Sequence, residues 1–290
     1  MKFTSRLSTL FNKTRVNIFK DEKILFRGRS KYRLLTVVEN PKNNTRALYA
    51  SNHLFVAGIN TKTRFPLHSP YFLADIFVPK PQSALFLGGG PNAVPTYVWK
   101  KYKPKLIHVV ERDNLTTLLA KKYFNLPNDK NYKIFHTDAK AFLNETQYKY
   151  DIIYFNLGLT RKRGINKNDL FPLCSYSGIL NLSNHLSKKG VLIYILISKL
   201  QGKGGLFMKK CLVSFNKIFP TAYVFSDFQH KTQKTQSVTF LCLKYKADIG
   251  MCYRKLLKLH LLTHERQIYD NLLSRIHKRK WSTSNLKPFI

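Results

Sequence analysis

Apolar and polar positions follow two different rhythms along this chain of 290 residues. Residues 24–78 contain short strand-like runs at Tyr32–Val38, Ala47–Ala50 and Leu54–Ala57, separated by turns rich in Asn, Pro and Gly. From residue 83 onward, short apolar runs alternate with segments of helical period. The first rhythm predicts a small antiparallel sheet, and the second predicts a mainly parallel, doubly wound sheet with helices on its faces.

The elements of this second part can be placed along the chain. Strands are expected at Ala84–Leu87, Leu106–Val110, Lys133–His136, Ile152–Phe155 and Val191–Ile197. Helices are expected at Ala93–Lys101, Leu115–Phe124, Ala139–Asn144, Leu173–Leu186 and Leu206–Phe219. Two closing strands, Ala222–Ser226 and Val238–Leu243, predict an antiparallel hairpin at the sheet edge. Gly190 and Pro220 stand where helices are expected to end.

The two ends of the chain are basic. Residues 1–20 carry several Lys and Arg and no acidic residue, which is typical of a mitochondrial presequence or of a basic arm that contacts nucleic acid. The tail from Met251 places Leu257, Leu261, Ile268, Leu272 and Ile276 at helical spacing among many basic residues. Such a helix either docks on its own domain or packs on a partner with its basic side along RNA.

The chain is therefore divided into four predicted parts. They are a basic arm or presequence-like segment (1–23), a small β domain (24–78), a Rossmann-like domain (79–248), and a basic amphipathic helix with its tail (249–290).

The net charge of the chain indicates which kinds of molecule it can bind. The chain has 50 Lys and Arg against 15 Asp and Glu, a formal net charge of +35. Self-repulsion of this size disfavours a compact monomer unless a polyanion neutralises it, and the candidates are a phosphate backbone and an anionic membrane. The longest apolar run, Val191–Ile197, is far shorter than the ~20 residues of a spanning helix, so no transmembrane segment is predicted.

The four cysteines, Cys174, Cys211, Cys242 and Cys252, are widely spaced and form no C-x-x-C pair. This spacing favours buried free thiols in a reducing compartment and gives no support to a metal site.

A glycine turn follows the first predicted strand of the α/β part. Gly88, Gly90 and Ala93 fit the G-x-G-x-x-G/A spacing, in which glycines allow a tight turn and the next helix begins at the ligand. Glu111 stands at the end of the second strand, about twenty residues later, where a carboxylate can accept hydrogen bonds from ribose hydroxyls. The pattern predicts a nucleotide-binding type of fold.

Further motifs occur in one order along the chain. They are Ser30-Lys31-Tyr32-Arg33, Leu87-Gly88-Gly89-Gly90, Val110-Glu111-Arg112-Asp113, Ala120-Lys121-Lys122-Tyr123-Phe124, Asp138-Ala139 with Phe142-Leu143, and Tyr150-Asp151-Ile152-Ile153. Together, from about residue 30 to residue 245, they resemble spermidine synthases, the aminopropyltransferase branch of the S-adenosylmethionine-dependent methyltransferase fold. The resemblance implies a Rossmann-like domain preceded by a small β-sheet.

The same resemblance implies an acidic active site that this sequence lacks. In the family a carboxylate just after the fourth strand acts on the attacking amine, and the residue here is Asn156, whose amide cannot accept a proton. Leu159 stands at the second acidic position, and Arg161, Lys162 and Arg163 follow it, so that a polyamine would be repelled. We therefore expect no catalytic residue and no polyamine substrate.

Other positions of the family pattern depart as well. Pro91 replaces the aspartate after the glycines, Arg33 replaces the opening glutamine, and only His68 remains of the Y-H-E triplet.

Cofactor binding stays open between two interpretations. The resemblance assigns the ribose to Glu111 and the adenine amine to Asp138, with Gly88, Gly90 and Ala93 in the loop. In the favoured interpretation no cofactor binds, and the acids are inherited surface residues, one of which caps the next helix. The alternative keeps residual binding of an S-adenosylmethionine-type nucleotide without catalysis.

Basic residues cluster with aromatic residues outside these motifs. Lys and Arg neutralise phosphates, while Tyr and Trp can stack on unpaired bases. The residues expected to contact RNA are Lys100, Lys101, Lys103, Lys105, Arg161, Lys162, Arg163, Lys167, Arg275, Lys278, Arg279 and Lys280. Because no sequence-reading module is visible, binding led by RNA shape and backbone is expected.

The leading hypothesis is a catalytically inactive spermidine-synthase-like protein that binds ribosomal RNA. Its partners would be ribosomal RNA and neighbouring ribosomal proteins, in a ribosome or assembly intermediate of the mitochondrial matrix. One alternative is an active S-adenosylmethionine-dependent transferase that acts on RNA. A second is a peripheral subunit of a mitochondrial membrane complex, with its basic surface on anionic lipid.

Overall fold

The computed structural model describes residues 22–51, 54–67, 70–157, 173–202, 205–226 and 235–257, together with Arg266, Tyr269, Asp270, Leu273 and Ser274. The chain divides into two compact units, one up to Leu67 and one from His68 onward. Residues 1–21 and 275–290, which hold most of the predicted arm and the end of the predicted tail, lie outside the described residues.

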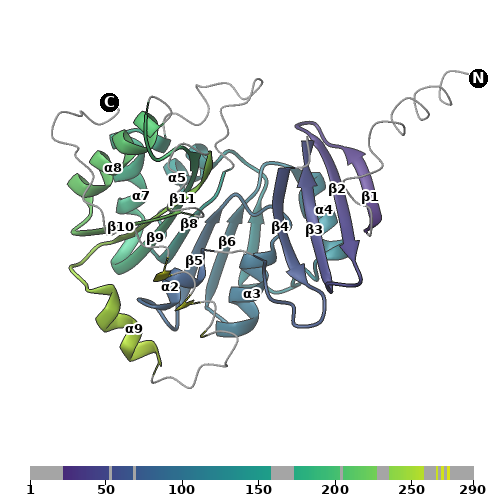
Figure 1. Ribbon diagram of the computed structural model, residues 1–290, viewed down its shortest axis with the longest axis horizontal. Helices are drawn as coiled ribbons and strands as arrows, with labels where there is room; N and C mark the ends of the chain where they lie inside the picture. The colour runs from purple at the N-terminus through teal and green to yellow at the C-terminus, as the bar shows by residue number, and fades with distance from the viewer. Residues whose placement is uncertain are drawn as a thin grey trace, which may run out of the picture. The chain divides into compact units, whose positions relative to one another are not determined.

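The first unit is a four-stranded antiparallel sheet in the order β1-β2-β3-β4 (Figure 1). Its strands are β1 (Lys23–Arg29), β2 (Leu34–Asn40), β3 (Thr45–Ala50) and β4 (Leu54–Asn60). The predicted small antiparallel sheet is confirmed, but β1 was not among the expected strands. Its sequence, KILFRGR, mixes cationic and apolar side chains on an edge strand, so it shows no clear alternation.

The first unit ends earlier than the predicted boundary at residue 78. Helix α2 (Phe72–Asp75) belongs to the second unit because the aromatic residues at its start pack there. The ring centroid of Tyr71 lies 5.9 Å from those of both Phe86 and Tyr154. The ring of Phe72 lies 5.2 Å from that of Tyr97.

The second unit is built on a seven-stranded sheet in the order β10-β11-β9-β8-β5-β6-β7. Its strands are β5 (Ser83–Leu87), β6 (Leu106–Val110), β7 (Tyr132–Phe135), β8 (Tyr150–Phe155), β9 (Leu186–Ser198), β10 (Thr221–Ser226) and β11 (Gln236–Leu243). Strands β5 to β9 pair in parallel, and β11 pairs antiparallel with both β9 and β10. The predicted parallel sheet with an antiparallel edge hairpin is confirmed.

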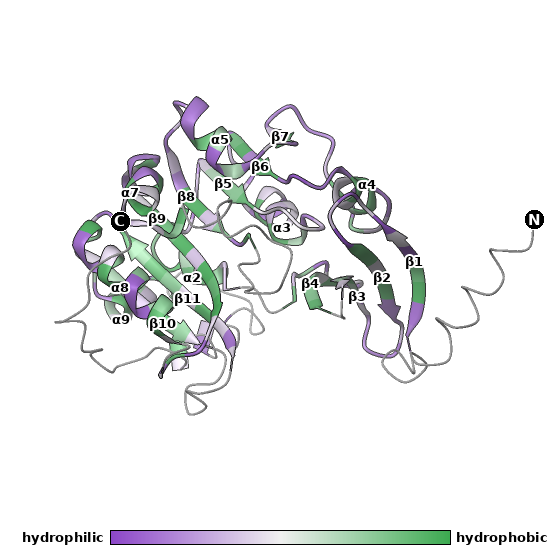
Figure 2. Cartoon of the chain, turned by 90° about the horizontal axis from the view of Figure 1, so that it is seen from above, coloured by the Kyte–Doolittle hydropathy of each residue, from purple (hydrophilic) through white to green (hydrophobic). Residues whose placement is uncertain are grey.

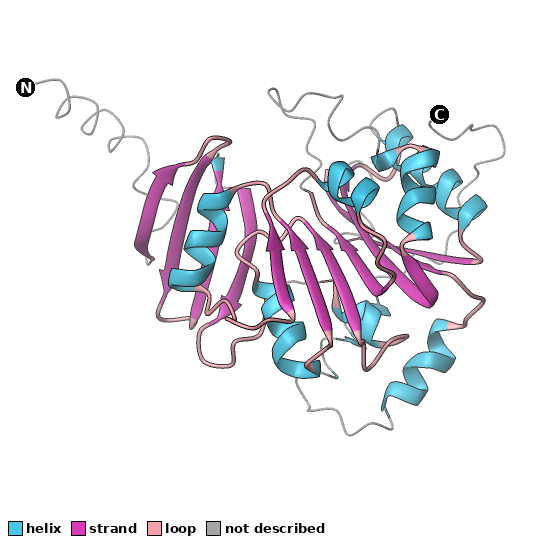
Figure 3. Cartoon of the chain, turned by 180° about the vertical axis from the view of Figure 1, so that it is seen from behind, coloured by secondary structure: helices cyan, strands magenta, loops and turns pink. Residues whose placement is uncertain are grey.

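Helices cover both faces of this sheet (Figure 3). They are α3 (Ala93–Tyr102), α4 (Asn114–Tyr123), α5 (Ala139–Glu145), α7 (Tyr176–Asn184) and α8 (Leu206–Ile218). A further helix, α9 (Ile249–Leu257), follows β11. Side chains of α5, α7 and α8 share one hydrophobic cluster with Leu85, Ile153 and Tyr194 of the sheet. Figure 2 shows that the central strands β8, β9 and β11 are predominantly hydrophobic, as expected for strands buried on two faces.

The segment between α7 and β9 differs from its prediction. A helix was expected to reach Leu186 and end near Gly190, whereas α7 ends at Asn184 and Gly190 lies inside β9. The pairing of β9 with β8 is irregular there, and a β-carbon at Gly190 would lie 2.9 Å from the β-carbon of Leu186. Gly190 is therefore needed because the backbone approaches Leu186 closely within β9. The prediction that it ends a helix was wrong.

The described part of the tail docks on its own unit. Helix α9 confirms the start of the predicted helix, while Leu261, Ile268, Leu272 and Ile276 lie outside the described residues. The hydroxyl of Tyr269 donates a 2.8 Å hydrogen bond to Oδ2 of the buried Asp75. In the described ranges, no helix has the length and apolar character needed to cross a membrane.

Candidate functional site

The glycine turn between β5 and α3 has the left-handed backbone that its residues predict. Gly88 and Gly90 have φ of 90° and 52°, and Asn92, the residue before α3, has φ of 57°. These are conformations that glycine, and less readily asparagine, adopts without severe strain. A β-carbon at Gly88 would lie 2.3 Å from the backbone oxygen of Asn156, so the approach of β5 to β8 itself requires glycine.

Glu111 is held by the loop it faces. Its Oε2 accepts a 2.9 Å hydrogen bond from the amide of Gly90, and its Oε1 accepts one of the same length from the amide of Asp113. The residue is 7% exposed. These two bonds hold the carboxylate of Glu111 against the loop, so the residue supports the turn.

Asn92 ties the same loop to the edge of the sheet. Its side-chain amide donates to the backbone oxygen of Gly90 at 3.2 Å, and its Oδ1 accepts a 2.9 Å bond from the hydroxyl of Tyr132 in β7. Asn92 is fully buried. These bonds stiffen the turn from within.

The other predicted cofactor residues have structural roles. Asp138 is the N-cap of α5, where its side chain accepts hydrogen bonds from the amides of Lys140 and Ala141. Ala93 begins α3 and is 2% exposed. Gly88, Gly90, Ala93 and Glu111 therefore meet at one loop, and Asp138 follows the neighbouring strand β7.

Asn156 follows β8 directly and faces the glycine turn with its backbone. Its amide donates a 2.9 Å hydrogen bond to the oxygen of Leu87. The predicted cations of the next segment, Arg161, Lys162, Arg163 and Lys167, lie outside the described residues, as do Arg275, Lys278, Arg279 and Lys280.

The four lysines at the end of α3 are not equivalent. Lys100, Lys103 and Lys105 are exposed, and Lys103 Nζ lies 3.3 Å from the centroid of the Trp99 ring. Lys101 is also exposed as a residue, but its Nζ lies 3.6 Å from Oδ2 of the buried Asp75 and its side chain is 24% exposed. Lys101 thus has a partner within the protein that the sequence pattern did not reveal.

Buried thiols behave as core residues. All four cysteines are free; Cys174, Cys211 and Cys242 are buried, whereas Cys252 is half-buried. Burial raises the pKa of Cys174 to about 11 although its sulfur shares a 2.9 Å hydrogen bond with the Tyr194 hydroxyl. A thiol with a raised pKa is a poor nucleophile. In the part of the chain that the structure covers, no three His, Cys, Asp or Glu side chains group as metal ligands would.

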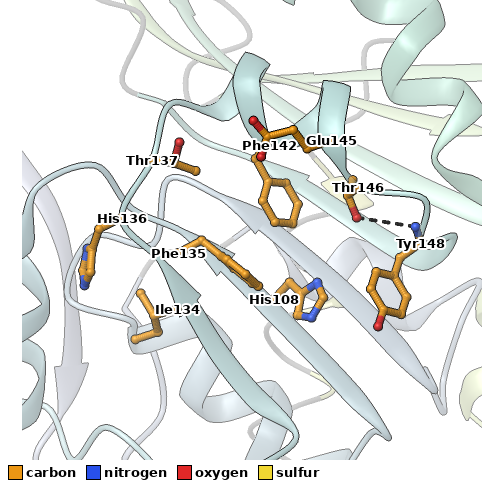
Figure 4. A pocket seen from close by; sticks show the side chains of 9 residues that line it. All are labelled: His108, Ile134, Phe135, His136, Thr137, Phe142, Glu145, Thr146 and Tyr148. Atoms are coloured by element: carbon orange, nitrogen blue, oxygen red, sulfur yellow. Dashed lines mark hydrogen bonds between the residues drawn. The ribbon is translucent and has the colours of Figure 1, made fainter.

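A pocket that the sequence did not predict lies beside β7 (Figure 4). Aromatic side chains of β6, β7 and α5 line it, with His108 among them. The only sequence signal was a histidine inside the apolar run LIHVV, which resembles an ordinary core position.

Residues 67–239, more than half of the chain, match the model of the spermine/spermidine synthase domain. A polyamine aminopropyltransferase of Streptococcus uberis is 26% identical over 140 residues, which are 46% of this chain and 47% of that protein. The chain thus spans about half the length of the curated relatives it matches.

Solved structures show the same fold. A probable spermidine synthase from Corynebacterium glutamicum aligns with a TM-score of 0.65 at 15% identity, covering 78% of this chain and 82% of that one. Human methyltransferase-like protein 13, solved in complex with SAH, aligns with a TM-score of 0.50 at 17% identity over 74% and 93% of the two chains. Sequence match and fold agree: the chain belongs to the spermine/spermidine synthase family.

Proposed function

We propose that this protein no longer transfers aminopropyl groups and serves as a structural RNA-binding component of a mitochondrial ribosome or of its assembly intermediate. The observation that carries the proposal is the net charge of +35 on a chain of this family. Polyamines are cations, so a surface that binds them needs carboxylates, whereas a surface of this charge attracts phosphate.

The residue after β8 supports the loss of catalysis. Asn156 stands where the family resemblance places the carboxylate that acts on the amine, and an amide cannot take up a proton. We expect the purified chain to show no aminopropyl transfer to putrescine or spermidine. We expect Asn156→Asp alone to leave it inactive, because Pro91 and Leu159 also replace acidic residues of the pattern. Measurable transfer by the unaltered chain would overturn this part of the proposal.

The cluster at the end of α3 supports the RNA contact. Lys103 lies over the ring of the partly exposed Trp99, and Lys100 and Lys105 are exposed close by in the sequence. This combination suits a phosphate backbone beside an unpaired base. Lys101 of the same cluster provides the control, because its ammonium is paired with Asp75.

Binding of a structured RNA at several salt concentrations tests this contact. Affinity should fall steeply between about 50 and 200 mM salt, because each neutralised phosphate releases counterions. The triple change of Lys100, Lys103 and Lys105 to Ala should reduce the slope of log affinity against log salt by up to about 3. Lys101→Ala should leave that slope unchanged. An affinity that does not depend on salt would contradict the phosphate contact.

The ribosomal setting is tested by purification of the tagged full chain from its native cells. Ribosomal RNA and ribosomal proteins should co-purify in amounts close to those of the chain. Recovery without RNA would contradict the setting, and recovery with a membrane complex would favour the lipid-facing alternative.

A second candidate function is an S-adenosylmethionine-dependent transferase that acts on RNA. It is favoured by the retained left-handed glycine turn and by Glu111 at the end of β6. The methyltransferase-like neighbour, solved in complex with SAH, has the same type of fold. Calorimetry with S-adenosylmethionine separates the two functions. Micromolar binding that Glu111→Gln abolishes would place this candidate first, and no binding would remove it.

A further inference from the structure

The pocket beside β7 is separate from the glycine turn. It has a volume of about 500 Å³, and its lining includes His108, Phe135, Phe142, Glu145, Thr146 and Tyr148. These residues come from β6, β7, α5 and the segment before β8, on the α5 face of the sheet (Figure 4). No residue of the Gly88–Asn92 turn lines the pocket. Its size falls within the range of about 300–1,000 Å³ that is usual for small-molecule sites.

The walls of the pocket are rings in fixed positions. The ring of His108 lies 4.9 Å from that of Phe135, 5.1 Å from that of Tyr148 and 5.9 Å from that of Phe142, each edge to face. His108 and Phe142 are 2% and 6% exposed, so their packing holds them in place, whereas Tyr148 is 53% exposed at the surface. The pocket therefore has a rigid aromatic interior and an accessible ring at its mouth.

The buried ring of His108 is uncharged at neutral pH. Nδ1 of His108 lies 2.8 Å from the hydroxyl of Tyr150. Burial and, secondarily, the nearby charge of Lys133 lower the pKa of His108 to about 4. Lys133 is exposed and is the cross-strand partner of His108 in the pairing of β6 with β7, whereas the carboxylate of Glu145 lines the pocket. The site therefore offers a cation for an anionic group of the ligand and a carboxylate for its N–H donors.

Polar groups at the edge of the pocket suit a flat heterocycle. The carboxylate of Glu145 can accept from ring or amino N–H groups, and the hydroxyls of Thr137 and Thr146 can donate or accept. Thr146 also accepts a 3.4 Å hydrogen bond from the amide of Tyr148, which fixes the mouth. Stacking surfaces with a few edge-directed polar groups are the usual means of binding an unpaired base.

We propose that this pocket takes an unpaired nucleobase of the bound RNA, stacked on Tyr148 and inserted toward Phe142 and His108. Lys133 lies outside the pocket, where it neutralises the phosphate of the inserted nucleotide. The inference rests on the proposed RNA binding and adds a base-dependent contact to the phosphate contacts of the surface.

Abasic RNA separates the two contacts. The full chain is titrated with a single-stranded RNA of about 12 nucleotides and with the same backbone carrying abasic sites. The base-bearing strand should bind about 5- to 100-fold more tightly, as expected for one stacked base. Tyr148→Ala should reduce this preference at least about 5-fold, the share of one stacked base, and leave the affinity for abasic RNA unchanged. Tyr32→Ala, a change at another exposed tyrosine in the first unit, should preserve it.

Each outcome has one meaning. Equal affinity of the unaltered chain for both strands would overturn the pocket and leave the salt-dependent phosphate contact standing. A preference that Tyr148→Ala leaves unchanged would also overturn the pocket. Failure to bind the base-bearing strand at low salt would overturn the pocket, and failure to bind a structured RNA as well would overturn the proposed RNA binding.

Discussion

Gly88 shows how a single missing β-carbon fixes the turn. Because its φ is 90° and a β-carbon would lie 2.3 Å from the Asn156 oxygen, Gly88→Ala should lower the free energy of unfolding. Strain at such a backbone position costs about 1–3 kcal/mol before the clash is counted. Gly250→Ala, in α9 with no positive φ and no β-carbon contact under 3.3 Å, is the control and should change stability by no more than about 1 kcal/mol. Denaturant unfolding measures both, and equal effects would contradict the explanation.

Glu111 gives a second prediction for a single residue. Glu111→Ala removes the acceptor for the amides of Gly90 and Asp113, and each buried amide left without a partner costs about 1–3 kcal/mol. Glu111→Gln keeps one acceptor oxygen but turns an NH2 donor toward the other amide, so it should also lower the free energy of unfolding. If Glu111→Ala were as stable as the unaltered chain, the carboxylate would not be the support of the loop. Urea unfolding at constant pH measures the three proteins.

His108 predicts a pH dependence with a definite sign. Its pKa of about 4 in the folded chain lies below the ~6.5 of an unfolded histidine, so the folded state favours the neutral ring. Its contribution to stability is therefore full above pH ~6.5 and is lost as pH falls toward 4. The neighbouring groups that carry or can take charge are Lys133, Glu145, Tyr148 and Tyr150. His108→Gln should make the loss of stability between pH 6.5 and 4 less steep, and an unchanged slope would contradict the assignment.

At the scale of elements, a hydrogen bond from the tail to α2 anchors the C-terminal segment. Tyr269 is 1% exposed and donates to the buried Asp75, so Tyr269→Phe should cost about 1.5–3 kcal/mol, as for a bond to a charged group. Tyr253→Phe is the matched control because its hydroxyl bonds to the exposed Asp270 and should cost less. Limited proteolysis should cut the C-terminal segment of Tyr269→Phe faster than that of Tyr253→Phe. Equal rates would show that this bond does not hold the segment.

Strands that are mostly apolar could be predicted from the sequence, whereas strands that mix apolar and charged residues could not. Strand β6 was predicted with its observed bounds because LIHVV is a continuous apolar run between polar residues. Strand β1 was missed because cations interrupt its edge pattern. Gly190 was misinterpreted because the same residue ends helices and permits close returns in strands, and only the pairing of β9 with β8 distinguishes the two.

One part of the candidate site could also be predicted from the sequence, and another part could not. The glycine turn could be predicted because Gly88, Gly90 and Glu111 lie at fixed spacing along the sequence. The pocket lined by His108, Phe142 and Tyr148 could not be predicted, because these rings meet only when β6, α5 and the segment before β8 are packed together. The ion pair of Lys101 with Asp75 could not be predicted either, because it forms only when α3 packs beside α2.

At the scale of the molecule, charge should make salt act in opposite directions on folding and on RNA binding. With +35 on 290 residues, self-repulsion destabilises the free chain, and added salt screens it. The melting temperature of the free protein should therefore rise by a few degrees from about 20 to 300 mM salt, since ~1 kcal/mol shifts Tm by about 2–4 °C in a domain of similar size. Over the same range the affinity for RNA should fall. Bound RNA should raise Tm most at low salt, where it replaces the missing counterions. Thermal unfolding with and without RNA across this range of salt tests whether self-repulsion destabilises the free chain. A Tm of the free chain that falls as salt is added would contradict this, because attractive ion pairs within the fold would then outweigh the repulsion.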